Sequence, residues 1–143
     1  MIIDTKLQFA KDVTLAASGN SDILDLGKSG YIGDGEDMVI AIAIESAANA
    51  TTTFKADLKF DDTATPATVV GSSTTKTLTI TTATTNPNDL IFIPVPAGLK
   101  GQYLMLTLTL AGTVGNVKYS AFLTTGDMVQ NTRQYAAGYT VNP

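Results

Sequence analysis

The chain has 143 residues, of which 44% are hydrophobic and 15% charged, so it is long enough for one domain with its own core and is globular rather than disordered. Its net charge of −4 and its single arginine, Arg133, argue against binding to nucleic acid or to an anionic membrane, because both need clustered cations. The absence of cysteine and histidine excludes disulfides, thiolate zinc sites and catalysis through a Ser-His-Asp or Cys-His arrangement.

The first elements are short. Met1–Lys6 lacks a basic region followed by an apolar run, so we expect no signal peptide. Apolar residues near alternate positions of residues 7–15 predict one or two short strands, and residues 16–21 predict a turn. Residues 23–26 predict another short strand, which Gly27 closes. Residues 28–37 contain three glycines after position 28 and predict a loop.

The middle of the chain holds two stronger strand patterns. Met38–Glu45 is apolar at both odd and even positions, which predicts a central strand partly covered on both sides. Its fully apolar part, Met38–Ile44, is much shorter than the ~18 residues that a membrane helix needs. Residues 54–60 show the cleanest alternation in the chain. The residues expected to face inward are Phe54, Ala56, Leu58 and Phe60.

The second half of the chain contains the strongest pattern. A loop at residues 62–68 precedes two weaker strands near a sheet edge, at residues 69–72 and 77–81, and a strand at residues 90–95. Pro94–Gly101 breaks the chain before Gln102–Leu110, which predicts a long strand. Its buried face is made of Leu104, Leu106, Leu108 and Leu110. These four leucines require a second apolar layer, and we expect Leu106 and Leu108 to pack against Ile40, Ile42 and Leu58.

Eight or more short strands, separated by turns rich in Gly, Pro and Asn and ending at residues 117–123, predict an all-β fold. We expect a single jelly-roll β-sandwich domain over residues 1–125 with extended N- and C-terminal arms. The alternation stops at Thr125, and residues 126–143 predict the extended C-terminal arm.

No motif for catalysis stands out. Gly30–Gly35 is superficially similar to a phosphate loop, but no helix follows it, so an ordinary loop is favoured. The two glutamates, Glu36 and Glu45, do not form a recognisable glycosidase pair. Calcium is the stronger alternative, because acids gather in the loops at residues 34–37 and 61–62, although ordinary loop acids are favoured. We therefore expect no catalytic residue, no cofactor and no metal site.

The candidate functional residues are of a kind that anchors protein interfaces. Tyr and Arg are enriched among interface hot spots, and the tail carries them without enough apolar residues for a core of its own. The residues expected to bind a partner are Met1, Ile2, Ile3, Tyr103, Met105, Arg133, Tyr135 and Tyr139. The apolar odd positions of Met38–Glu45, together with Tyr103 and Met105, are the expected contact between copies of the chain.

Several short motifs, taken in order, resemble one family. They are Ile23–Gly27, Ile32–Glu36, Ile93–Pro96, Tyr103–Leu106 and Tyr135–Tyr139. In order and spacing they resemble the capsid cement, or decoration, proteins of tailed bacteriophages, with the type known from short-tailed Bordetella-like phages as the nearest. The resemblance spans nearly the whole chain. At Met105 the family commonly has arginine or another polar residue.

The resemblance implies a jelly-roll structural protein of the virion, made in the host cytoplasm and bound to the outer surface of an assembled icosahedral capsid. Its implied partners are the major capsid protein, whose neighbouring subunits it clamps, and other copies of itself, with a dimer preferred over a trimer. The alternative is a carbohydrate-binding β-sandwich module of a phage tail or a bacterial enzyme. The absence of Trp and the wide spacing of the tyrosines count against this alternative.

Overall fold

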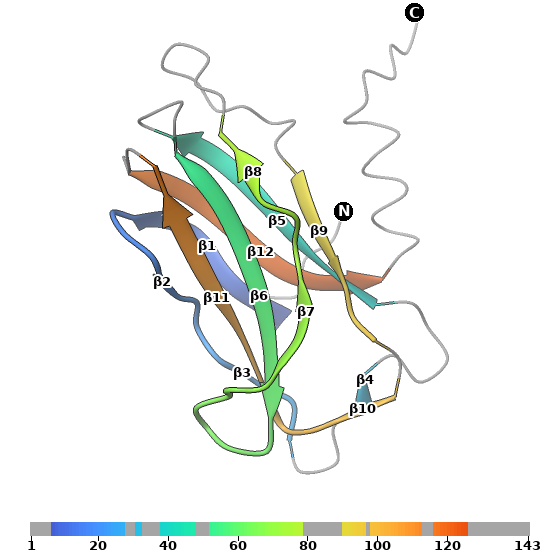
Figure 1. Cartoon of the computed structure of the whole chain (residues 1–143). Coiled ribbons are helices and arrows are strands. Elements are labelled where there is room, and N and C mark those ends of the chain that lie inside the picture. The colour runs from blue at the N-terminus through green and yellow to red at the C-terminus, as the bar shows by residue number, and fades with distance from the viewer. Residues whose placement is uncertain are drawn as a thin grey trace, which may run out of the picture.

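The computed structural model describes residues 7–27, 31–32, 38–47, 52–78, 90–96, 98–112 and 116–125. These residues form an all-β structure of two main antiparallel sheets (Figure 1). The four-stranded sheet contains β1 (Gln8–Leu15), β12 (Val117–Thr125), β5 (Met38–Ala47) and β9 (Leu90–Pro94), in that order. The six-stranded sheet contains β2 (Gly19–Asn20), β3 (Leu24–Asp25), β11 (Tyr103–Ala111), β6 (Thr53–Asp61), β7 (Val69–Ser72) and β8 (Lys76–Thr77). The short strands β4 (Tyr31–Ile32) and β10 (Leu99–Lys100) pair with each other.

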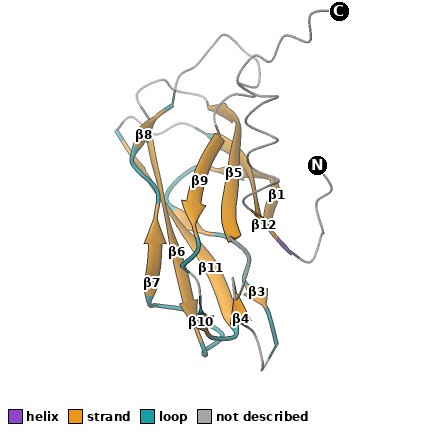
Figure 2. Cartoon of the chain, turned by 90° about the vertical axis from the view of Figure 1, so that its right-hand side faces the viewer, coloured by secondary structure: helices purple, strands orange, loops and turns teal. Residues whose placement is uncertain are grey.

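The two main sheets face each other as the layers of a β-sandwich. Seen from the side, β6 and β7 lie in one layer and β5 and β9 in the other, with β4 and β10 at one end (Figure 2). The all-β expectation is confirmed. No segment in the described part of the chain is a helix that would cross a membrane.

The strongest sequence pattern forms the centre of the six-stranded sheet. β11 pairs with β6 along its full length, from Tyr103 opposite Asp61 to Ala111 opposite Thr53. The four leucines of β11 are buried, and the inward residues of β6 alternate with partly exposed ones as expected. Both strands therefore have one face in the core and one face directed outward.

The other strong pattern, β5, is the inner strand that the sequence predicted. It pairs with β12 on one side and β9 on the other. The register with β12 shifts between Lys118 and Tyr119, which leaves Glu45 as the extra residue on β5. The edge strand β1 carries two register shifts, and Asp12 within it has a positive φ of 50°. Such irregularity disfavours the addition of a further strand at this edge.

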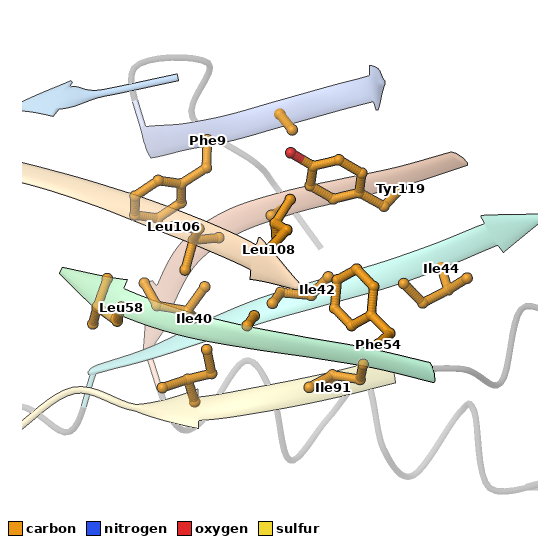
Figure 3. Close-up of a cluster of buried hydrophobic side chains, with 14 of the residues drawn as sticks. Phe9, Ile40, Ile42, Ile44, Phe54, Leu58, Ile91, Leu106, Leu108 and Tyr119 are labelled. Atoms are coloured by element: carbon orange, nitrogen blue, oxygen red, sulfur yellow. The ribbon is translucent and has the colours of Figure 1, made fainter. Parts of the chain in front are cut away.

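The core lies between the two sheets (Figure 3). The expected contact layer is confirmed, because Ile40, Ile42, Leu58, Leu106 and Leu108 are all fully buried. The remaining large side chains that are fully buried are Tyr119, Phe9, Phe54, Leu78, Ile93, Leu104 and Val117.

The sheets approach closely where β7 passes β9. A Cβ atom added at Gly71 of β7 would lie 3.1 Å from Ile93 Cγ2 and 3.3 Å from the Pro94 carbonyl oxygen. A side chain at this position would require Ile93 or the Pro94 backbone to shift by a few tenths of an ångström, so Gly71 suits the close approach of the two sheets at this edge.

Three expectations about loops were wrong in detail. The expected turn at residues 16–21 contains β2, the expected loop at residues 28–37 contains β4, and the expected break at Pro94–Gly101 contains β10. Each of these strands has only two residues, which is too short for an alternating pattern to show in the sequence. The weak strand expected at residues 77–81 begins one residue earlier, as β8, and its last three residues lie outside the described part.

Candidate interaction surface

Two of the expected partner-binding residues lie in the described structure. Tyr103 and Met105 are at the start of β11. Met1, Ile2, Ile3, Arg133, Tyr135 and Tyr139 lie outside the described residues, as does the expected C-terminal arm. The site is therefore built from β11 and the strands beside it.

Tyr103 and Met105 point away from the core. Their neighbours Leu104 and Leu106 are fully buried between the sheets, so the intervening odd positions lie on the outer face of the six-stranded sheet. Tyr103 is partly exposed, whereas Met105 is only 8% exposed. Met105 is thus mostly covered within the single chain and offers less free apolar surface than the sequence suggested.

Tyr103 has an aspartate on each side. It pairs with Asp25 of β3 and with Asp61 of β6. Leu24 and Phe60, the neighbours of these aspartates, are buried, so both carboxylates share the outer face with the Tyr103 ring. We call Asp25, Tyr103 and Asp61 the Asp-Tyr-Asp row. Directly opposite residues of antiparallel strands have Cβ atoms about 4.5–5.5 Å apart, so the three side chains are immediate neighbours.

Neutral donors hold the two carboxylates in place. Asp25 Oδ1 accepts hydrogen bonds from the Gly27 N–H at 2.8 Å and from Gln102 Nε2 at 2.9 Å. The Gly27 bond, followed by the Gln102 bond, lowers the pKa of Asp25 below its ordinary value. Because these donors are uncharged, they orient the carboxylate without cancelling its charge.

Asp61 is held in a similar way. Its Oδ2 accepts hydrogen bonds from Thr68 Oγ1 at 3.1 Å and from the Ala67 N–H at 3.4 Å, and its Oδ1 accepts one from the Asp62 N–H at 3.2 Å. The Thr68 hydroxyl is the largest cause of a lowered pKa for Asp61. These bonds also tie the loop that follows β6 to the end of the sheet.

A second row on the same face is mainly apolar. Met105 pairs with Lys59, and Lys59 pairs with Val69 of the edge strand β7. On the other side, the Ser21 N–H donates to the Leu106 carbonyl and Leu24 pairs with Leu104, so Asp22 and Ile23 together lie opposite Met105. Ile23, the neighbour of the buried Leu24, is the one on the outer face. Ile23 is 41% exposed and Val69 is 52% exposed. We call Ile23, Met105, Lys59 and Val69 the apolar row, in which Lys59 supplies its aliphatic stem.

The other expected contact surface lies on the opposite side of the sandwich. Ile40, Ile42 and Ile44 face the core, so the odd positions of β5 lie on the outer face of the four-stranded sheet. Ala41 pairs with Phe92 and Phe122 on that face. Ala41 is only 2% exposed and Phe122 only 6%, whereas Val39, Ala43 and Phe92 are partly exposed, so this face is buried only in part within the single chain. One twofold contact between copies cannot include both this face and Tyr103.

The described acids do not form a metal site. No group of three potential ligands occurs among the described residues. Asp61, one of the two adjacent acids considered for calcium, already accepts three hydrogen bonds from within the chain. The other considered acids, at residues 34, 36 and 37, lie outside the described residues.

Five residues of this surface were not expected from the sequence, namely Ile23, Asp25, Lys59, Asp61 and Val69. Alternation assigned Asp61 to the water-facing side of its strand, but a single strand pattern does not show which residues of other strands lie beside it. The register of β3, β11 and β6 supplies that information. No protein-family model and no curated protein matches the chain.

Proposed function

We propose that the chain is a structural protein of a phage virion, which binds the outer surface of the assembled icosahedral capsid and clamps neighbouring major capsid subunits. The proposal rests on the resemblance of the ordered motifs to capsid cement proteins. The finer jelly-roll topology and the terminal arms, which the same resemblance implies, belong to this proposal.

The observation that carries the proposal is the pairing of two of these motifs. Ile23–Gly27 and Tyr103–Leu106 are far apart in the chain, yet Asp25 pairs with Tyr103 and Leu24 with Leu104. They meet on a partly exposed outer face that carries an aromatic ring, exposed aliphatic side chains and two carboxylates that no ion pair within the described part of the chain reaches. A protein that acts by adhering to a shell needs such a face rather than a catalytic pocket.

The proposal is tested by reconstitution on capsids. The reading frames next to this gene are searched for a major capsid protein, and shells assembled from that protein alone are mixed with the purified chain. We expect saturable binding at a fixed number of copies per shell, seen by co-sedimentation and as added density in electron microscopy. We also expect decorated shells to resist heat better than bare shells. The proposal would be contradicted if the chain bound neither to expanded shells, nor to DNA-free shells, nor to DNA-filled shells.

A further inference from the structure

We propose that the Asp-Tyr-Asp row and the apolar row together form a docking surface for a protein segment that carries an arginine or lysine next to an aliphatic side chain. The cation lies on the Tyr103 ring between the carboxylates, and the aliphatic side chain lies beside it on the apolar row. The inference deepens the proposed function. It rests on that function where it assigns the bound segment to the major capsid protein.

The first argument is that Asp25 and Asp61 differ in their partners from two other outward acids of the sandwich. Asp57 and Glu45 each have a cationic partner, since Lys55 Nζ lies 3.4 Å from Asp57 and Lys118 Nζ lies 3.5 Å from Glu45. Among the described residues, no ion pair reaches Asp25 or Asp61, and the donors that hydrogen-bond to them are neutral. Two oriented and uncompensated carboxylates therefore favour a basic group on this face.

The second argument is the aromatic ring between them. A guanidinium or ammonium group is attracted to the face of a tyrosine ring, and carboxylates at the ring's sides add to this attraction. Adjacent strands lie about 4.8 Å apart, so the Asp25 and Asp61 backbones are separated by roughly 10 Å with Tyr103 between them. The Tyr103 side chain lies between the two carboxylates, and their oxygens already accept hydrogen bonds from within the chain, which disfavours their sharing one metal ion. The same separation suits a side chain that lies across the ring.

The third argument is the adjacent apolar row. Ile23 and Val69 are two of the exposed large hydrophobic residues of the described chain, and they lie on either side of Met105 and Lys59. A bound segment would remove this apolar surface from water while its cation contacts the Asp-Tyr-Asp row. The Lys59 ammonium group repels a basic partner. Removing its charge should therefore strengthen binding of that partner, whereas removing the charge of Asp25 or Asp61 should weaken it.

The test uses a peptide probe and needs no capsid. The ¹⁵N-labelled full-length chain is titrated with acetyl-Val-Arg-Val-amide and, as the matched control, with the citrulline peptide of nearly the same shape and no charge. We expect a dissociation constant on the order of 1 mM for the arginine peptide, typical of a small contact. The shifted amide signals should come from residues 23–25, 59–61 and 103–105, and the citrulline peptide should bind roughly threefold to tenfold more weakly.

Four variants separate the contributions of individual charged side chains to binding of the arginine peptide. Asp25→Asn and Asp61→Asn keep an oxygen acceptor for the local hydrogen bonds, and each should weaken binding of the arginine peptide. Asp57→Asn, an acid already paired with Lys55, should leave binding almost unchanged. Lys59→Met keeps the apolar stem and should strengthen binding by up to about twofold, since an exposed charge contributes little.

The proposal is overturned if the two peptides bind equally, if the shifted signals lie elsewhere, if no signal shifts at millimolar peptide, or if Lys59→Met weakens binding. Its failure is distinguishable from failure of the proposed function. Peptide binding without capsid decoration refutes the capsid proposal alone, and decoration that is insensitive to Asp25→Asn and Asp61→Asn refutes this docking surface alone.

Discussion

Replacing Tyr119 with phenylalanine is expected to stabilise the protein. The Tyr119 side chain is fully buried in the core beside Phe54, and its hydroxyl has no hydrogen-bond partner within the described part of the chain. A buried and unpaired polar group typically costs about 1–3 kcal/mol in the free energy of unfolding. Tyr119→Phe removes that cost and leaves only a small void. We expect a gain of about 1 kcal/mol near neutral pH, which corresponds to a rise in melting temperature of about 3 °C.

The gain should grow at alkaline pH. Burial, with a smaller contribution from the charge of Asp22, raises the pKa of Tyr119 from 10.0 to about 12 in the folded chain. Above pH 10 the unfolded chain therefore releases this proton while the folded chain retains it, so the free energy of unfolding falls as pH rises from 10 to 12. A shift of two units corresponds to a loss on the order of 2–3 kcal/mol. The Tyr119→Phe chain lacks this loss.

Urea denaturation of both chains at several pH values from neutral to strongly alkaline measures the effect. All other side chains are the same in the two proteins, so the difference between the two curves isolates Tyr119. A phenylalanine variant less stable than the wild type by 1 kcal/mol or more would show that the hydroxyl is satisfied, for example by a buried water. A stability difference that stays constant from neutral pH upward would refute the raised pKa.

Three further predictions concern the core, a close approach and the tail. Leu106→Ala should lower the free energy of unfolding by ~2–5 kcal/mol because Leu106 is fully buried. Thr107→Ala, its outward neighbour, should cost less than about 1 kcal/mol, and equal losses would mean that the register is wrong. Gly101→Ala places a Cβ 2.9 Å from the Phe60 ring and should cost about 1–3 kcal/mol, which Phe60→Leu in the same chain should partly restore. Deleting Gln130–Pro143 should leave the urea curve almost unchanged and weaken capsid attachment; unchanged attachment would place the clamp elsewhere.

Most of the sandwich follows from short-range patterns in the sequence. β6 and β11 alternate strictly, so the identity of their buried faces was available before any pairing was known. β5 is apolar on both faces, and that pattern identified it as an inner strand. The two-residue strands β2, β4 and β10 were not predictable, because they depend on partners far away in the chain rather than on their own residues.

The candidate surface was predictable only in part. Tyr103 and Met105 were expected, with the apolar odd positions of Met38–Glu45, to form a contact between copies of the chain. That Met105 is mostly covered, and that Asp25 and Asp61 flank Tyr103, depends on the register between three strands. A strand pattern determines which residues share one face of that strand, but neighbours across strands depend on turn lengths and bulges.

The same alternation makes the surface separable from the fold in experiments. Along β11 the even positions pack in the core, whereas Tyr103 and Thr107 lie on the outer face and contact neighbouring strands. Substitutions at even positions therefore change the free energy of unfolding, since they open cavities in a densely packed interior. Substitutions of exposed charges on the outer face change it little. A variant such as Asp25→Asn that keeps the urea curve and loses the arginine peptide would consequently report on recognition alone. A variant that loses both would point to the hydrogen bond from Gln102, which links Asp25 to the start of β11.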